Sequence, residues 1–287
     1  MTALSAATFA CLESHEASPE IGEVAILAVL QGLTEFLPVS SSGHLTLGRA
    51  IFGVEGIEGA LLTVALHVGT LVAVLAVYGR DLIGVLRRAI AGNPRDLGLI
   101  LLGSVPAATI GLAFGEFFER TFESPNVAAI CLLVTAVWLV LGDRARGRQR
   151  AGASAAGTGL EGLGAGQALA IGVAQAVAIF PGISRSGSTI ATGLLLGLET
   201  SVAARFSFLL SLPAVGGAAL LELGDLGTVD RETGVAVLIG IVISAVVGVL
   251  ALKGLLLALK RGAFGIFAAY CAVLGLAWLV FGPFSLA

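Results

Sequence analysis

The chain has 287 residues, of which 57% are hydrophobic and only 12% are charged, and its mean hydropathy is +1.00. Soluble domains carry about 25% charged residues, so this composition excludes an ordinary soluble domain and predicts an integral membrane protein. The formal net charge of -3 is too small to indicate nucleic acid or acidic partners. The three cysteines are widely spaced and form no metal or redox motif, so we interpret them as small apolar residues in helices.

Six apolar runs are long enough for transmembrane helices, each of which needs about 20 mostly apolar residues. Residues 1–20, which precede them, lack the basic start of a signal peptide, and we interpret this segment as a short polar lead. Each run is flanked by charged residues or by Gly and Pro. The six predicted spans cover residues 60–78, 97–115, 126–142, 202–222, 234–252 and 264–282.

Two further apolar stretches, at residues 22–52 and 166–197, are interrupted by polar clusters and are too short on either side to cross a membrane. The interruptions are PVSSSGH at residues 38–44 and PGISRSGST at residues 181–189. A helix–turn–helix that enters the membrane and returns to the same side fits these lengths. Irregular backbone at membrane depth is tolerated only where protein or a water-filled cavity surrounds it. We therefore predict two re-entrant helical hairpins.

The two clusters belong to an internal repeat, because they align without a gap when the sequence is shifted by 144 residues. Each half then contains one hairpin and three spans. Since three spans end on the opposite side of the membrane, the second half must be inverted relative to the first. Broken helices in inverted repeats place their binding site near the midplane, where the repeats meet. The aligned pairs are Gln31 with Gln175, Phe36 with Phe180, Ser40 with Ser184, Ser42 with Ser186 and Gly43 with Gly187.

The predicted fold is an all-α polytopic membrane protein with six transmembrane helices and two re-entrant helical hairpins in an inverted repeat. It forms a single integral membrane domain, with a first repeat at residues 21–142, a flexible cytoplasmic linker at 143–165 and a second repeat at 166–287. The loops on one side of the predicted membrane carry eleven Lys and Arg residues, and the loops on the other side carry Arg120 and Arg231. The basic side should be cytoplasmic, so the mouth of the first hairpin faces outside.

The first cluster combines a carboxylate, hydroxyl groups and an imidazole. Gln31 and Glu35 are four residues apart and share one helix face, and three serines and His44 follow within nine residues. Ionisable groups inside a membrane are costly to keep and are functional candidates by default. The alternative is that Glu35 and the serines only cap the broken helix.

The second cluster places Arg185 between Ser184 and Ser186. Its planar guanidinium suits phosphate, and the helix that follows offers free N–H groups to an anion. Thr189 would add a hydroxyl. The alternative is that Arg185 forms a structural salt bridge with Glu35 across the repeat, which does not exclude phosphate binding. Together the clusters suit phosphoryl transfer, whose main need is positioning and charge neutralisation.

Three stretches resemble a known family. QGLTEFLPVSSSGH at residues 31–44 is similar to the first signature of the undecaprenyl pyrophosphate phosphatases, the bacitracin-resistance type of membrane phosphatase. PGISRSGST at 181–189 resembles the second signature, and ARFSFLLSLP at 204–213 is also similar to the family. The resemblance implies hydrolysis of a polyprenyl, undecaprenyl-type, pyrophosphate to the monophosphate and inorganic phosphate. This reaction recycles the carrier lipid for cell-envelope glycans, and loss of the pyrophosphate lipid underlies bacitracin resistance.

The resemblance also implies roles for single residues. Glu35 would bind a divalent cation or act as a base, and Ser41 or His44 would serve as nucleophile or acid–base partner. Arg185 would hold the phosphates. Many members carry Glu where this chain has Gln31, whose amide oxygen can still coordinate Mg²⁺ or Ca²⁺ beside Glu35. The residues assigned to substrate binding are Gln31, Ser40, Ser42, Ser184, Ser186 and Thr189.

We therefore predict an enzyme of the cell membrane, a polyprenyl diphosphate phosphatase whose site opens to the outer side. Its partners are the pyrophosphate lipid and the bilayer, not nucleic acid, and a homodimer is left open. The main alternative is a transporter or flippase for a phosphate-bearing lipid, which the inverted repeat and the broken helices support. Glu35 beside His44 favours hydrolysis because both groups can move protons. We expect His67, inside a predicted span, to hydrogen-bond between helices.

Overall fold

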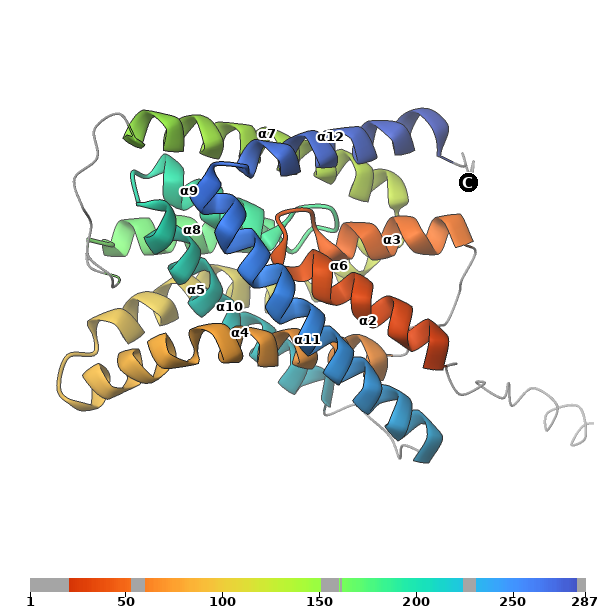
Figure 1. The fold of residues 1–287 in the computed structure, drawn as a ribbon, viewed down its shortest axis with the longest axis horizontal. Coiled ribbons are helices and arrows are strands. Elements are labelled where there is room, and N and C mark those ends of the chain that lie inside the picture. The colour runs from red at the N-terminus through yellow and green to blue at the C-terminus, as the bar shows by residue number, and fades with distance from the viewer. Residues whose placement is uncertain (1–20, 53–59, 151–159, 161, 224–230, 283–287) are drawn as a thin grey trace, which may run out of the picture.

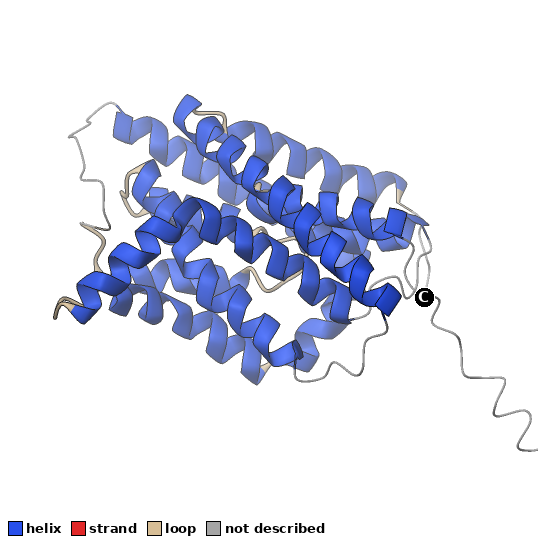
Figure 2. Cartoon of the chain, turned by 60° about the horizontal axis from the view of Figure 1, so that its bottom comes forward, coloured by secondary structure: helices blue, strands red, loops and turns tan. Residues whose placement is uncertain are grey.

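The computed structural model describes residues 21–52, 60–150, 160, 162–223 and 231–282. Within these residues the chain consists of helices joined by loops and turns, and Figure 2 shows no strand in this part of the chain. The helices in chain order are α2 (Ile21–Phe36), α3 (Ser41–Phe52), α4 (Ala60–Ile90), α5 (Arg95–Ala113), α6 (Gly115–Phe122), α7 (Pro125–Arg150), α8 (Ala165–Val177), α9 (Arg185–Leu195), α10 (Thr200–Leu223), α11 (Arg231–Arg261) and α12 (Phe264–Phe281).

Six of these helices, α4, α5, α7, α10, α11 and α12, are long and apolar enough to cross a membrane, which confirms the six predicted spans. Two of them extend well beyond the predicted ends. α4 and α11 have 31 residues each, or about 46 Å at 1.5 Å per residue, against about 30 Å for a hydrocarbon core. Their last turns carry Arg87 and Arg88 in α4, and Lys260 and Arg261 in α11. A prediction based on hydrophobicity ends the span before these basic turns. The helix itself continues, because basic residues are tolerated in the headgroup region.

The outer faces of the long helices are apolar. On α12, Ile266, Val273 and Val280 follow one another at seven-residue intervals, and they are 68%, 68% and 58% exposed. On α11, Leu238 and Leu250 are 61% and 65% exposed. Soluble proteins rarely expose so continuous an apolar surface, and a membrane-spanning helix must present one to lipid. The chain is therefore a multi-pass membrane protein.

The two interrupted stretches fold as helix pairs, α2 with α3 and α8 with α9. α3 begins at Ser41 and α9 begins at Arg185, which lies 144 residues later, as the repeat predicts. In Figure 1 the first pair lies on the right and the second on the left, with their turns toward the middle of the molecule. Two hairpins that enter from opposite sides require this arrangement. Their depth in a bilayer stays a prediction.

Several helix contacts cross between the two halves of the chain. α2 packs on α11 and, in the matching arrangement, α8 packs on α5, while α4 packs on α10 and α7 packs on α12. The contact between α8 and α5 depends on glycine, because a Cβ on Gly172 would lie 2.2 Å from the carbonyl oxygen of Gly103. Membrane helices reach such close packing through small residues. The halves are therefore interlocked, which brings the two turns together.

Three segments differ from the sequence-based prediction or lie in part outside the described residues. α6 was not predicted, because a helix of eight residues is too short for a search based on spans. α7 continues to Arg150, so the first part of the predicted linker at 143–165 is helical. Near the end of that linker, Arg95 of α5 donates to the carbonyl oxygens of Leu160 and Leu163 at 3.4 and 2.7 Å. The polar lead at 1–20 and the linker residues 151–159 and 161 lie outside the described residues.

Basic residues gather at one end of the helix bundle. The turn between α4 and α5, the end of α7 and the turn between α11 and α12, with the helix ends beside them, carry the eleven Lys and Arg residues. All three regions lie on the left in Figure 1, whereas the start of α11 lies on the right. The separation of charge that was predicted from the loops is therefore a property of the fold.

Candidate active site

The first turn of the site joins α2 to α3 and holds an unusual backbone conformation. Pro38 cannot donate to a helix, so α2 ends before it. Ser40 follows in the left-handed region with φ +67°, the one non-glycine residue with a positive φ in the described part of the chain. The chain thereby reverses direction within a few residues. Glu35 is left in the last turn of α2, and Ser41 starts α3.

The second turn, which joins α8 to α9, is anchored to α7. Gly182 has φ +92°, and a Cβ at this position would lie 2.1 Å from the carbonyl oxygen of Ala128 in α7. Only glycine satisfies both conditions. Thr135, also in α7, donates its hydroxyl to the Gly182 carbonyl oxygen at 2.9 Å and accepts the backbone N–H of Ser184 at 3.0 Å. Arg185, the next residue, is thereby held at a fixed place.

Two serines cap the helices that leave these turns. The hydroxyl of Ser40 accepts the backbone N–H of Gly43 at 3.2 Å, and that of Ser184 accepts the backbone N–H of Gly187 at 3.1 Å. Such caps stabilise a helix start by about 1 kcal/mol each. The helix starts also touch each other's turn, since a Cβ on Gly43 would lie 2.9 Å from the Cα of Gly182. The positive ends of two helix dipoles therefore meet at one place.

Glu35 is the centre of the polar contacts at this place. Its carboxylate accepts a guanidinium N–H from Arg185 at 2.7 Å, the hydroxyl of Ser41 at 2.8 Å and the amide N–H of Gln31 at 3.1 Å. The side chains of Glu35 and Arg185 are only 7% and 18% exposed. The carboxylate comes from the first half of the chain and the guanidinium from the second. The structure thus brings together four of the predicted site residues.

A narrow crevice, too small to hold a water molecule, adjoins the ion pair between Glu35 and Arg185. Its walls come from α2, α4, α9 and α10. The wall residues other than the ion pair are mainly apolar. The lining residues are Glu35, Phe36, Thr70, Leu71, Val74, Arg185, Ser211 and Val215.

Comparison with known proteins identifies the family. Residues 24–277 match the family model described as Bacitracin resistance protein BacA. The chain belongs to this family. The undecaprenyl-diphosphatase of Desulforapulum autotrophicum is 40% identical, over 92% of this chain and 99% of the relative. That of Desulfosudis oleivorans is 43% identical, over 87% and 94% of the two chains. That of Methanosphaera stadtmanae is 37% identical, over 89% and 95%.

The sequence suggests that His44 acts beside Glu35, but the ring of His44 contacts other groups. Its Nε2 lies 2.6 Å from the hydroxyl oxygen of Tyr270 in α12, and its Nδ1 lies 2.7 Å from the carbonyl oxygen of Ser40. His44 and Ser41 are three residues apart on α3, so they share one helix face. Tyr270 was not identified from the sequence, because it lies within a predicted span and outside every polar cluster.

The remaining predicted substrate-binding residues hold the scaffold together. Ser186 donates its hydroxyl to the carbonyl oxygen of Leu37 at 3.3 Å, which joins the two turns. The hydroxyl of Ser42 lies 3.2 Å from that of Ser40. Thr189 is fully buried, and its hydroxyl donates to the carbonyl oxygen of Arg185 at 2.7 Å and lies against the hydroxyl of Ser207 in α10. The contacts of Thr189 therefore position α9, and Ser207 is a residue that the sequence analysis missed.

A divalent cation is compatible with the residues around Glu35. The amide oxygen of Gln31 is buried and has no hydrogen-bond partner. The N–H of the same amide group donates to Glu35. Within the described residues, no group of three or more His, Cys, Asp or Glu side chains lies close enough to hold a metal. One carboxylate and one amide oxygen suit Mg²⁺ when phosphate oxygens and water complete its coordination. The Nδ1 of His67, which we expected to hydrogen-bond between helices, lies 2.8 Å from the carbonyl oxygen of Thr63 in the same helix.

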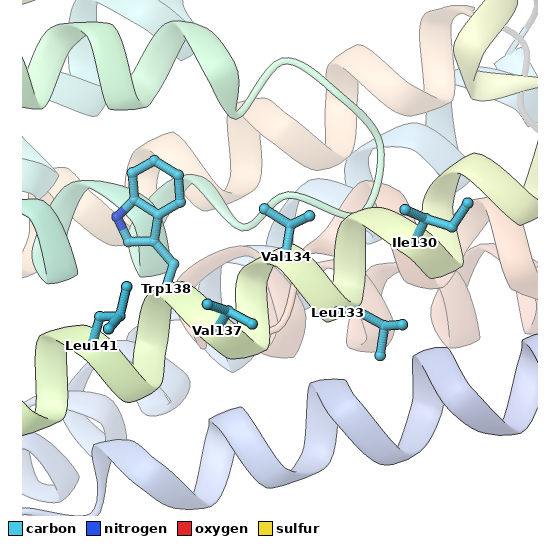
Figure 3. Close-up of a pocket in the computed structure, with 6 residues that line it drawn as sticks. All are labelled: Ile130, Leu133, Val134, Val137, Trp138 and Leu141. Atoms are coloured by element: carbon cyan, nitrogen blue, oxygen red, sulfur yellow. The ribbon is translucent and has the colours of Figure 1, made fainter.

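A broad groove on the outer flank of α7 is a different kind of surface (Figure 3). Its lining is apolar except for the indole N–H of Trp138, which donates to Thr192 of α9 at 3.1 Å. Without charged groups it does not suit a phosphate, and it matches the lipid-facing surfaces of the other spans. The lining residues are Ile130, Leu133, Val134, Val137, Trp138 and Leu141.

Proposed function

We propose that this chain is a polyprenyl diphosphate phosphatase, which hydrolyses an undecaprenyl-type pyrophosphate to the monophosphate and inorganic phosphate. The observation that carries the proposal is the buried contact of Glu35 with Ser41 and Arg185, where the starts of α3 and α9 meet. A carboxylate, a hydroxyl and a guanidinium in one site supply a base, a nucleophile and a phosphate clamp. The relatives named undecaprenyl-diphosphatase support the same reaction and the same class of lipid.

Arg185 is the phosphate clamp. A guanidinium carries five N–H donors in a planar fork, and Glu35 takes one of them. The other donors suit phosphate oxygens, which a guanidinium binds in a bidentate way. The helix starts at Ser41 and Arg185 add backbone N–H groups and the positive ends of two dipoles. Fixed positive groups of this kind stabilise the charge that spreads over phosphate oxygens in the transition state.

Ser41 is the proposed nucleophile because its hydroxyl already donates to Glu35 at 2.8 Å. In the first step its Oγ forms a bond to the terminal phosphorus, and its proton passes to the Glu35 carboxylate. The bond between that phosphorus and the bridging oxygen breaks, and the polyprenyl monophosphate leaves with the electron pair. A water molecule activated by Glu35 in place of Ser41 would give the same products, and Ser41→Ala distinguishes the two routes, since it stops only the first.

In the second step water attacks the phosphorus of the phosphoserine. The proton of the water passes to His44, which shares a helix face with Ser41. The bond between phosphorus and Oγ breaks, and Glu35 returns its proton to Oγ. One water is consumed, inorganic phosphate is released, and His44 gives its proton to solvent. Every group of the site is thereby restored.

A divalent cation, Mg²⁺ or Ca²⁺, is part of the proposal. Glu35 and the unpartnered amide oxygen of Gln31 would hold it together with the phosphate oxygens. A cation at this place neutralises charge on the pyrophosphate. Because the protein supplies few ligands, we expect the cation to bind with the substrate and only weakly without it.

The proposed location is the cell membrane, with the site open to the outer side. The eleven basic residues at one end of the bundle support a cytoplasmic position for that end. Cysteines introduced at the exposed positions Asn93 and Glu119, in a Cys11→Ser background, test this orientation. The two other native cysteines, Cys131 and Cys271, are buried. In intact cells a membrane-impermeant maleimide should label position 119 and not position 93, and the reverse pattern contradicts the proposal.

Phosphate release by the purified protein tests the proposed reaction. In detergent micelles without a second compartment, a phosphatase releases inorganic phosphate from a polyprenyl pyrophosphate in the presence of Mg²⁺ or Ca²⁺. Glu35→Gln, which keeps the side-chain shape and removes the charge, serves as the inactive control. The alternative of a transporter or flippase, which the crossed contacts between repeats favour, predicts no phosphate release in micelles. A rate that does not differ between the native chain and Glu35→Gln contradicts the phosphatase.

A further inference from the structure

The His44 ring is fixed at both of its nitrogen atoms. Its Nδ1 lies 2.7 Å from the carbonyl oxygen of Ser40, and its Nε2 lies 2.6 Å from the hydroxyl oxygen of Tyr270. A carbonyl oxygen only accepts hydrogen bonds, so Nδ1 must carry a proton. In the neutral ring, Nε2 then has a lone pair and accepts the O–H of Tyr270. The contacts together select one of the two neutral tautomers.

The backbone of the first turn and α12 both contribute to this arrangement. Ser40 has φ +67°, and its carbonyl oxygen accepts both the backbone N–H of His44 at 3.2 Å and the ring Nδ1–H. On α12, the rings of Tyr270 and His44 are nearly parallel, with an interplanar angle of 2° and centroids 5.6 Å apart. The next residue, Cys271, has its sulfur 3.6 Å from the carbonyl oxygen of Pro38. α12 therefore holds the first turn at two successive positions.

We propose that Tyr270 positions His44 and relays a proton to it in the phosphatase reaction: its hydroxyl holds His44 with Nδ1 protonated and gives its own proton to Nε2. The inference rests on the proposed function, in which His44 takes the proton of water. A phenol hydroxyl both donates and accepts. It donates to the one lone pair of Nε2 in the neutral ring, so the proton of the water reaches Nε2 through the phenol. The O–H proton moves to Nε2, the phenol oxygen takes the proton of the water, and it then accepts from the imidazolium Nε2–H. One contact of 2.6 Å thus keeps the ring in place in both states.

Tyr270→Phe tests this role, because it removes the hydroxyl and keeps the ring. We expect kcat to fall about tenfold, part of the 10²–10⁴-fold that a positioned acid–base group contributes, and KM to stay within about twofold. The matched control is Tyr78→Phe, at the one other tyrosine of the chain. Tyr78 is buried in α4 and stacks on Phe208, with centroids 5.6 Å apart. This control should keep the native kcat.

A spectroscopic measurement tests the contact without reference to activity. The chain has three histidines, so ¹⁵N-histidine labelling gives few ring signals, and His44→Gln identifies those of His44. The native protein should show a protonated Nδ1 and an unprotonated Nε2. An imidazole nitrogen that accepts a hydrogen bond resonates upfield of one that does not. Tyr270→Phe should therefore move the His44 Nε2 signal downfield, and Tyr78→Phe should leave it in place.

Four results overturn the inference, and the last of them also removes His44 from the proposed mechanism. The first is a native His44 protonated at Nε2 in its neutral form, and the second is an Nε2 signal that Tyr270→Phe does not move. The third is native kcat in Tyr270→Phe while His44→Gln is impaired, which refutes the role of Tyr270 alone and leaves the proposed function intact. Native kcat in His44→Gln, by contrast, removes His44 from the proposed mechanism, and the role of Tyr270 in the reaction falls with it.

Discussion

Arg185→Lys separates the charge of the clamp from its shape. The guanidinium of Arg185 gives one N–H to Glu35 at 2.7 Å and has others left for phosphate. A lysine keeps the positive charge but cannot form the planar fork, so it must give up one of these contacts or weaken both. A hydrogen bond to a charged group contributes about 1.5–3 kcal/mol. Loss of about 2–3 kcal/mol in the transition state lowers kcat/KM by about 30- to 150-fold.

Arg185→Lys is a more specific test of catalysis than Arg185→Ala. Alanine would leave the carboxylate of Glu35, which is 7% exposed, without its ion-pair partner. Breaking a buried pair in this way costs about 3–5 kcal/mol of stability, so lost activity would then reflect unfolding as well as catalysis. Phosphate release from a polyprenyl pyrophosphate in detergent measures kcat/KM, and a thermal unfolding curve in the same detergent verifies the fold.

Arg205→Lys provides the matched control. Arg205 of α10 contacts Asp81 of α4 through a single pair of atoms at 3.4 Å, a contact that an ammonium group can also make. This variant should retain kcat/KM within about twofold, because a partly exposed ion pair contributes at most about 1 kcal/mol. The assignment of Arg185 as a bidentate phosphate clamp is refuted if Arg185→Lys, folded like the native chain, keeps kcat/KM within about threefold.

Three further variants test other parts of the site. Glu35→Gln removes the proton acceptor beside Ser41, so kcat should fall about 100-fold or more in the phosphate-release assay, and a fall under tenfold contradicts the role of Glu35 as base. In Gly182→Ala, the added Cβ would lie 2.1 Å from a carbonyl oxygen, and the alanine would have to adopt a φ of +92°. It should lower the unfolding free energy by about 2 kcal/mol or more, whereas Gly166→Ala, which has open space around it, should not. Gln31→Glu adds a second carboxylate near Glu35, so the Mg²⁺ concentration for half-maximal rate should fall; an unchanged or higher value would exclude Gln31 from the cation site.

The main features of the fold could be predicted because the membrane imposes simple length rules. A run of about 20 apolar residues forms a span, and a stretch broken by Pro and Gly cannot. These two rules yielded six spans and two helix pairs, and the repeat predicted that α3 and α9 begin at aligned positions. Neither rule detects α6 or the last turns of α4, because those residues are amphipathic or basic. Hydrophobicity locates where a helix lies in lipid but not where its hydrogen bonding ends.

The contact of Glu35 with Arg185 was considered from the sequence as a structural alternative, and the structure contains it. Other contacts could not be inferred, since they depend on three-dimensional packing. Thr189 and Arg185 are close in sequence, yet the hydroxyl of Thr189 is buried against Ser207 of another helix. Tyr270 reaches His44 across 226 residues of chain. No periodicity or motif marks either partner, because a single polar residue in an apolar helix has no pattern of its own.

The repeat forms one composite site and not two equal sites, because its halves carry different side chains at the aligned positions. Both turns keep the capping serines, but the first supplies a carboxylate and the second a guanidinium. If the halves were identical, two like charges would meet in a buried place, where water screens their repulsion only weakly. Opposite charges instead attract across the repeat and hold the turns together before substrate arrives. In the proposed function a phosphate accepts the remaining guanidinium donors, so one ion pair would both assemble the site and align it for the substrate. The aligned positions that differ are Glu35 with Ile179, Ser41 with Arg185 and His44 with Ser188.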